Sequence, residues 1–142
     1  NNAGRLLVLY KESGGTERPY DGNFTTGNGH FIRTTGNNFA ARINSISNAS
    51  FNMNTAGIGF KSVMRDSSTD IRVQNGNTLY SGTQANNGFP TLEYWLLRTA
   101  NIYSDAGISC YWIGASITNT QIANFRTYYN TFLVSNGLTA VA

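Results

Sequence analysis

The sequence predicts an all-β protein, a two-sheet antiparallel sandwich or jelly roll, with one C-terminal amphipathic helix over residues 118–136. Gly, Asn, Ser and Thr make up 62 of the 142 residues, and charged residues only 12%. That charged share is about half the usual one, and it excludes a coiled coil, a charged helical bundle and a charge-rich disordered tail. Strand-like segments recur with turn signals between them, which is typical of sandwiches. No linker or repeat divides the chain, so we expect a single domain over residues 1–142.

The first half of the chain contains several expected strands and one expected long loop. Residues 6–10 are apolar without alternation, which predicts a strand covered on both faces. Residues 13–29 are rich in Gly and contain Pro19, which predicts a loop. Further strands are expected over residues 30–34, 38–44, 49–54 and 58–65. In the second of these Phe39, Ala41 and Ile43 share one face, and in the last Phe60 and Met64 face opposite to Val63 and Arg65.

The second half begins with the clearest local signal, a hairpin over residues 71–80. Its Asn75-Gly76 pair favours a tight primed turn, in which we expect both residues to adopt positive φ. A loop over 83–90 precedes two aromatic strands, 92–98 and 108–114, which are joined through 101–107 and should place Trp95 and Trp112 in the core.

One segment has the 3.6-residue period of a helix. Thr118 and Gln121 form a capping box, and Gly137 stands at the C′ position. Between them one apolar stripe runs along the segment and should pack against the β-structure. Its members are Ile122, Phe125, Tyr129, Phe132 and Leu133.

Charge and cysteine content exclude several classes of protein. The net charge of +3 comes from scattered arginines, without the basic stripe that nucleic-acid binding needs. The single Cys110 forms no internal disulfide, and its strand-like surroundings predict a buried, inert thiol. No apolar run is long enough to span a membrane. Because the sequence starts at Asn1 without Met, we expect a processed product or a fragment of a longer chain.

The acidic residues predict no catalytic site. Glycosidases need two carboxyl groups about 5–9 Å apart, and no expected strand carries such a pair. Asp66 and Asp70 bracket a turn, where solvent-exposed carboxylates are expected, and Glu93 should point outward from its strand. His30, the single histidine, has no Cys or acidic partner at the spacing of a metal site or a catalytic triad. We therefore expect a protein that is not an enzyme and has no cofactor.

Two loops supply candidate ligand-binding residues. Aromatic faces beside side-chain amides suit the C–H faces and hydroxyl groups of sugars, although the same aromatics could simply anchor the loops to the sandwich. Asp21 and Asn23 also resemble a fragment of a calcium loop, but Ca²⁺ takes six to eight oxygens, so a plain turn is the simpler explanation and no metal is expected. The candidates are Tyr20, Asp21, Asn23, Phe24, Asn86, Asn87 and Phe89.

The last third of the chain resembles a known family. The segments concerned are Tyr103-Ser104-Asp105, residues 108–114 and the turn Ile117-Thr118-Asn119 that leads into the helix. They are similar to the end of concanavalin A-like (laminin G-like) jelly-roll domains found in phage and other virion structural proteins. Asn119 replaces the usual acidic residue of that turn, and the acidic cluster of the family's glucanase members has no match. The hairpin from Arg72 to Tyr80, with its central Asn-Gly, also resembles the middle hairpin of the family. Together these segments cover roughly residues 60–138, and the resemblance implies a jelly roll.

From the resemblance and the charge-poor composition we expect a non-enzymatic carbohydrate- or receptor-binding or adhesion domain of a virion or extracellular assembly. A phage tail, fibre or capsid decoration would be such a setting. The expected partners are a glycan or cell-surface receptor and neighbouring virion subunits, in a homo-oligomer or larger assembly. Two alternatives remain open: a purely structural capsid or tail protein that contacts neighbouring subunits, and, with less support, a glycan hydrolase.

Overall fold

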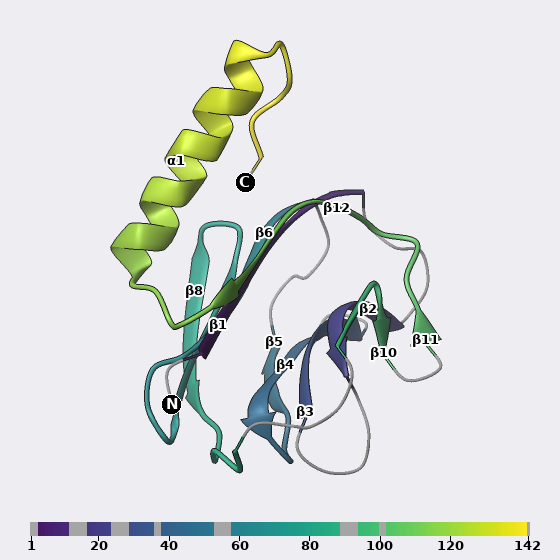
Figure 1. Cartoon of the computed structure of the whole chain (residues 1–142), viewed down its shortest axis with the longest axis vertical. Coiled ribbons are helices and arrows are strands. Elements are labelled where there is room, and N and C mark those ends of the chain that lie inside the picture. The colour runs from purple at the N-terminus through teal and green to yellow at the C-terminus, as the bar shows by residue number, and fades with distance from the viewer. Residues whose placement is uncertain are drawn as a thin grey trace.

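The computed structural model describes residues 3–11, 17–23, 29–35, 38–52, 58–88, 94–99 and 102–141 (Figure 1). In this part of the chain two antiparallel sheets of five strands each and a C-terminal helix confirm the predicted sandwich. The first sheet, in the order β12-β1-β6-β7-β8, comprises β1 (Ala3–Lys11), β6 (Gly59–Arg65), β7 (Asp70–Asn75), β8 (Thr78–Thr83) and β12 (Gly107–Gly114). The second, in the order β5-β4-β3-β2-β9, comprises β2 (Glu17–Asn23), β3 (Gly29–Thr35), β4 (Asn38–Ser45), β5 (Ala49–Asn52) and β9 (Trp95–Leu96). The strands β10 (Arg98–Thr99) and β11 (Ile102–Tyr103) form a separate small pair.

The first sheet is the middle of three layers. Helix α1 (Asn119–Ser135) lies on one of its faces and the second sheet on the other (Figure 1). The prediction that β1 is covered on both faces is confirmed, because Leu7 and Leu9 belong to the core between the sheets and Leu6 and Val8 to the core under the helix. The expected faces of β4 and β6 are confirmed as well: Phe39, Ala41, Ile43 and Val63 lie between the sheets, and Phe60 and Met64 under the helix.

The prediction of a loop over residues 13–29 is wrong for its central part. Strand β2 pairs with β3 along its length, with a register shift between Pro19 and Asp21, and with β9 at Asp21 and Gly22. Gly22 has a φ of 114°, and a Cβ there would lie 1.9 Å from the carbonyl oxygen of His30, so only glycine fits this close approach. Gly and Pro favour turns only on average, and in β2 they occupy positions of an irregular strand.

The predicted hairpin is confirmed, but its turn lies one residue later than expected. Asn75 pairs with Thr78, so the two central residues are Gly76 and Asn77. Gly76 has a φ of 56°, and no other residue of this turn has a positive φ. This pattern is that of a type II′ turn, which needs glycine at its first central position only.

The expected strand over residues 92–98 is interrupted. Glu93 lies outside the described residues, β9 has two residues, and Leu97 breaks the strand with a φ of 58°. Trp95 and Trp112 are both partly exposed rather than buried in the core. Trp112 packs at the edge of the core under the helix, and Cys110 beside it is also only half-buried.

The helix begins and ends as predicted. The Thr118 hydroxyl accepts a hydrogen bond from the Gln121 amide at 3.2 Å, and the Gln121 side chain accepts one from the Thr118 amide at 2.8 Å. Gly137 follows the helix with a φ of 74°. The apolar stripe is narrower than expected, because Ile122 and Leu133 are buried whereas Phe132 is 59% exposed. The described helix is neither long nor apolar enough to cross a bilayer.

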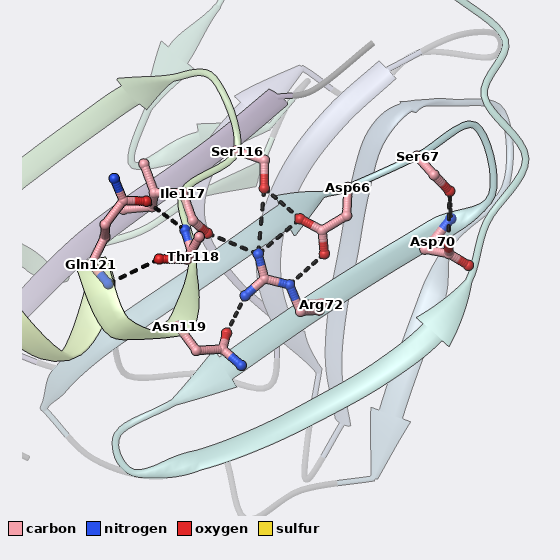
Figure 2. A network of polar contacts seen from close by, with 9 residues as sticks. All are labelled: Asp66, Ser67, Asp70, Arg72, Ser116, Ile117, Thr118, Asn119 and Gln121. Carbon is pink, nitrogen blue, oxygen red and sulfur yellow. Dashed lines mark hydrogen bonds and ion pairs between the residues drawn. The ribbon is translucent and has the colours of Figure 1, made fainter.

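Arg72 of β7 fastens the start of the helix to the first sheet (Figure 2). Its guanidinium donates to both carboxylate oxygens of Asp66, to the Ile117 carbonyl at 2.8 Å and to the Asn119 side chain. The hydrogen bond from Arg72 lowers the pKa of the Asp66 carboxyl group. Asp66 is therefore not the freely solvated turn residue that the sequence predicts, whereas Asp70 is exposed in its turn.

Candidate functional site

Of the ligand-binding residues that the sequence predicts, the structure buries two in a strand and holds two in a loop by hydrogen bonds. Tyr20 and Asp21 are fully buried in β2, and the Tyr20 hydroxyl lies 3.1 Å from that of Thr34. A side chain without exposed surface cannot offer its face to a ligand, so placing these two residues in a binding loop is wrong. The backbone of Asn23 pairs with His30, and Phe24 and Phe89 lie outside the described residues.

The amides of Asn86 and Asn87 shape the loop that carries them. The Asn86 carboxamide accepts a hydrogen bond from the Gly88 amide at 2.9 Å, and that of Asn87 accepts one from the Ile46 amide at 3.3 Å. The backbone of Asn87 also donates to the Asn44 carbonyl at 2.7 Å, which ties the loop to the end of β4. These contacts make both residues part of the loop's architecture.

Asp21 is the centre of a buried hydrogen-bond cluster between the sheets. Its Oδ1 accepts from the Ile32 amide at 2.6 Å, and its Oδ2 accepts from the hydroxyls of Tyr94 at 2.5 Å and Tyr111 at 3.1 Å. Three donors thus occupy both oxygens of one carboxyl group. The partners come from β3, from the residue before β9 and from β12, so the cluster joins both sheets.

Burial dominates the acid–base properties of this cluster. It raises the pKa of Asp21 above its usual range, against the opposing effect of the nearby Arg5 guanidinium. Burial, with the Asp21 charge as the next cause, also raises the pKa of the hydroxyls of Tyr94 and Tyr111. Both phenols therefore remain protonated donors over the physiological range.

The Asp21 carboxyl group is unsuited to hold calcium. Both of its oxygens already accept hydrogen bonds, and it has no exposed surface. Within the described ranges, no three His, Cys, Asp or Glu side chains gather where they could hold a metal ion.

An exposed groove, lined in part by Tyr111, lies between β12, the end of β1 and the segment around Leu97. Its volume is about 370 Å³, within the usual range for small-ligand sites. Five consecutive residues of β12 form much of its wall, and two tyrosines are among the lining residues. The lining residues are Tyr10, Leu96, Leu97, Ala106, Gly107, Ile108, Ser109, Cys110 and Tyr111.

Aromatic side chains gather on the segments that flank this groove. The Arg98 guanidinium lies 4.3 Å from the ring centre of Trp95 and 4.9 Å from that of Tyr103. The Leu97 carbonyl, which accepts from the Ser104 amide at 2.8 Å, holds the β9–β10 segment against the chain that follows β11. Tyr103 is 68% exposed, so its ring offers surface to a ligand.

Tyr10 forms the opposite wall, and its position depends on a glycine. A Cβ at Gly107 would lie 2.3 Å from Cζ of Tyr10, which means that the ring rests directly on the Gly107 backbone. Nearby, Lys11 and Asp105 form an exposed ion pair at 3.4 Å. The surroundings of the groove thus combine aromatic rings with charges that largely balance.

Cys110 also lines the groove, but its side chain packs against the core under the helix, and this environment makes the thiol a poor nucleophile. Burial raises its pKa, so the thiolate is scarce at neutral pH. This agrees with the inert thiol that the sequence predicts, although the side chain is only half-buried.

The sequence missed this groove because its residues come from distant parts of the chain. The aromatic residues Tyr94, Trp95 and Tyr103 are apparent in the sequence, but the strand pattern predicted that Trp95 lies in the core. The break at Leu97, which turns Trp95 and Arg98 toward Tyr103, has no signal in the sequence, because leucine rarely adopts a positive φ.

The comparisons with known proteins leave the groove without a precedent. No family model, no curated protein and no solved structure matches this chain.

Proposed function

We propose that this protein is a non-enzymatic binding domain that holds a carbohydrate, free or on a receptor, in the groove between Tyr10 and the Trp95–Arg98–Tyr103 stack. The observation that carries the proposal is the exposed Tyr103 ring, stacked on Arg98. It precedes Ser104, whose amide donates to Leu97, a lining residue of the groove of about 370 Å³. It replaces the loop residues that the sequence alone suggested.

The chemistry of the groove suits a neutral or weakly charged sugar. Aromatic rings accept the C–H face of a pyranose, and exposed backbone groups and the Arg98 guanidinium can bind hydroxyl groups. Beside the groove, the charges of Lys11 and Asp105 compensate each other in an ion pair. A shallow aromatic surface with few cations favours sugars over nucleic acids, which demand several cations.

The resemblance to virion jelly-roll domains supports a setting on a virion or another extracellular assembly. In that setting the groove would attach the assembly to surface glycans, with many copies raising the overall affinity.

A second candidate, a structural subunit-contact protein, is favoured by the apolar surface around α1. Tyr128, Phe132, Val134 and Leu138 are all more than half exposed. A hollow of about 340 Å³ beside them has mostly apolar walls that include Ile58, Leu133 and Val141. Such surface is commonly covered by another protein. Analytical ultracentrifugation over a hundredfold concentration range tests this candidate, which a strictly monomeric protein would overturn.

A glycan array, followed by calorimetry on the best ligand, tests carbohydrate binding. We expect Tyr103→Ala to weaken binding at least tenfold, because it removes the exposed stacking ring. Tyr128→Ala is the matched control, since that tyrosine is 74% exposed on the helix, away from the groove. Equal affinity of both variants, or no binding by the wild type, would overturn the proposal. Release of reducing ends from a bound glycan would show that the protein is an enzyme.

A further inference from the structure

The groove adjoins the apolar hollow beside the C-terminal half of α1. Tyr10 and Ser109 line both of them. The hollow has a volume of about 340 Å³, similar to that of the groove, and it lies within the usual range for small-ligand sites. Because two residues belong to both walls, the groove and the hollow meet at Tyr10 and Ser109.

The hollow differs from the groove in the chemistry of its walls. Ser109 and Tyr129 line it, and their hydroxyls share a hydrogen bond at 2.7 Å, while the Ser109 hydroxyl also donates to the Val8 carbonyl at 3.3 Å. These polar groups are thus satisfied within the protein, and the hollow favours an apolar guest. None of the described residues that line it carries a charge, and four have aliphatic side chains: Ile58, Leu133, Leu138 and Val141.

Hydrogen bonds fix the segment 138–141, which supplies three of the residues that line the hollow. The Leu138 amide donates to the Leu133 carbonyl at 2.9 Å. The Asn130 side chain accepts from the Val141 amide and donates to the Val141 carbonyl, each at 3.0 Å. The hollow is therefore preformed, and a ligand fills it without the cost of first ordering this segment.

Tyr10 stands where the two spaces meet. It is largely exposed, and its ring rests on the Gly107 backbone, so that it is supported from one side. A tyrosine ring offers an apolar face together with a polar hydroxyl. This residue therefore suits the point at which the polar and the apolar part of one ligand join.

We infer that the groove and the hollow together bind one amphiphile of the glycolipid class, with its sugar in the groove and its alkyl or acyl chain in the hollow. The inference rests on the proposed function and adds the chemical class of the group to which the sugar is attached. A lipid chain is an uncharged, apolar guest for walls without charge. Each methylene group that enters the hollow should strengthen binding about two- to fourfold, until the chain fills the space.

Calorimetry with paired glycosides tests the inference. The probes are the methyl and octyl β-glycosides of glucose, galactose and N-acetylglucosamine, each below its micelle-forming concentration, and 1-octanol as a chain without a sugar. We expect the octyl glycoside of a sugar that binds to have at least tenfold higher affinity than its methyl glycoside. 1-Octanol should bind more weakly than that octyl glycoside, because it leaves the groove empty.

Variants of the hollow locate the chain. Ile58→Trp narrows the hollow, so the gain from the octyl chain should fall below threefold, while affinity for the methyl glycoside stays within twofold of wild type. Leu138→Asp brings a charge to the same space and should have the same effect. Ile46→Trp is the matched control and should keep the full gain, since Ile46 is 58% exposed against 52% for Ile58 and is not among the residues that line either space.

The outcomes separate this inference from the proposed function. Equal affinity for the methyl and octyl glycosides would overturn the inference and leave sugar binding in the groove intact. A full gain that persists in Ile58→Trp or Leu138→Asp would show that the chain binds elsewhere, and 1-octanol that binds as tightly as the octyl glycoside would show that no combined site exists; either result overturns the inference. If no octyl glycoside binds, the inference fails, and the glycan array decides separately whether the groove binds a sugar.

Discussion

Tyr111 joins the groove to the buried carboxyl group of Asp21. Its hydroxyl lies 3.1 Å from Oδ2 of Asp21, and the same residue lines the groove. One strand, β12, therefore contributes both to the wall of a candidate ligand site and to the polar cluster that fixes the two sheets to each other. Rigid support of this kind maintains the geometry of a shallow binding site.

Removing the Tyr111 hydroxyl should lower the stability of the protein but leave the groove in place. In Tyr111→Phe the Asp21 carboxyl group loses one of three donors in a buried position, and we expect a loss of about 1–2 kcal/mol in the free energy of unfolding. Urea denaturation measures this loss. Tyr128→Phe, on the exposed face of α1, should change stability by less than about 0.5 kcal/mol. Equal stability of the two variants would show that the Asp21 cluster contributes little.

The single histidine should make the protein less stable in acid. The pKa of His30 is about 3 in the fold against 6.5 in the unfolded chain, so the unfolded chain takes up the proton first as pH falls. The stabilisation is complete above pH 6.5 and is lost progressively toward pH 3. After allowance for partial solvent contact, we expect a loss of roughly 2–4 kcal/mol over this range.

Two measurements check this behaviour. The imidazole signals of the one histidine in NMR spectra should not titrate between pH 8 and pH 5. In His30→Gln the acid-dependent loss of stability should shrink markedly. A midpoint near pH 6.5 for the imidazole signals would contradict the burial of His30.

Arg72 should be the main polar attachment of the helix. Arg72→Ala removes the donors to Asp66, Ile117 and Asn119 (Figure 2), and we expect a loss of about 2 kcal/mol. Faster amide hydrogen exchange confined to α1 should accompany it. Arg126→Ala is the matched control, because among the residues that the structure describes Arg126 donates only to the Gly76 carbonyl. Equal protection of the α1 amides from hydrogen exchange in both variants would contradict this prediction.

Gly107 should matter for binding more than for stability. An alanine Cβ at this position would displace the Tyr10 ring, which is 63% exposed and free to turn away. We expect Gly107→Ala to weaken sugar binding about tenfold while stability changes by less than about 1 kcal/mol. Calorimetry and urea denaturation measure the two effects. Unchanged affinity would show that Tyr10 does not contact the ligand.

The local signals in the sequence predicted the regular elements well. The capping box at Thr118 and Gln121, the glycine at 137 and the alternation in β4 each depend on neighbours within a few residues, so they are visible in the chain itself. The hairpin was visible for the same reason, although the choice between Gly76 and Asn75 as the first central residue depends on strand register, which the sequence does not show.

The candidate sites could not be predicted in this way. Tyr20 and Asp21 lie in a segment with the composition of a loop, yet pairing with β3 and β9 makes it a buried strand. The groove needs the break at Leu97 to turn Trp95 and Arg98 toward Tyr103. These outcomes depend on contacts between residues that are far apart in the chain.

The sequence by itself determined the class of this protein: few charges, many turns, alternating strands and one capped helix leave a β-sandwich as the architecture that buries its apolar residues. Only the tertiary structure decided which polar groups are buried and which aromatic rings are exposed. Secondary structure follows from periodic, short-range preferences, whereas a site is formed by strands whose pairing is set by the cooperative packing of the whole core. For that reason Arg5, Asp21 and His30 came together between the sheets, and Tyr10 and Tyr103 remained at the surface.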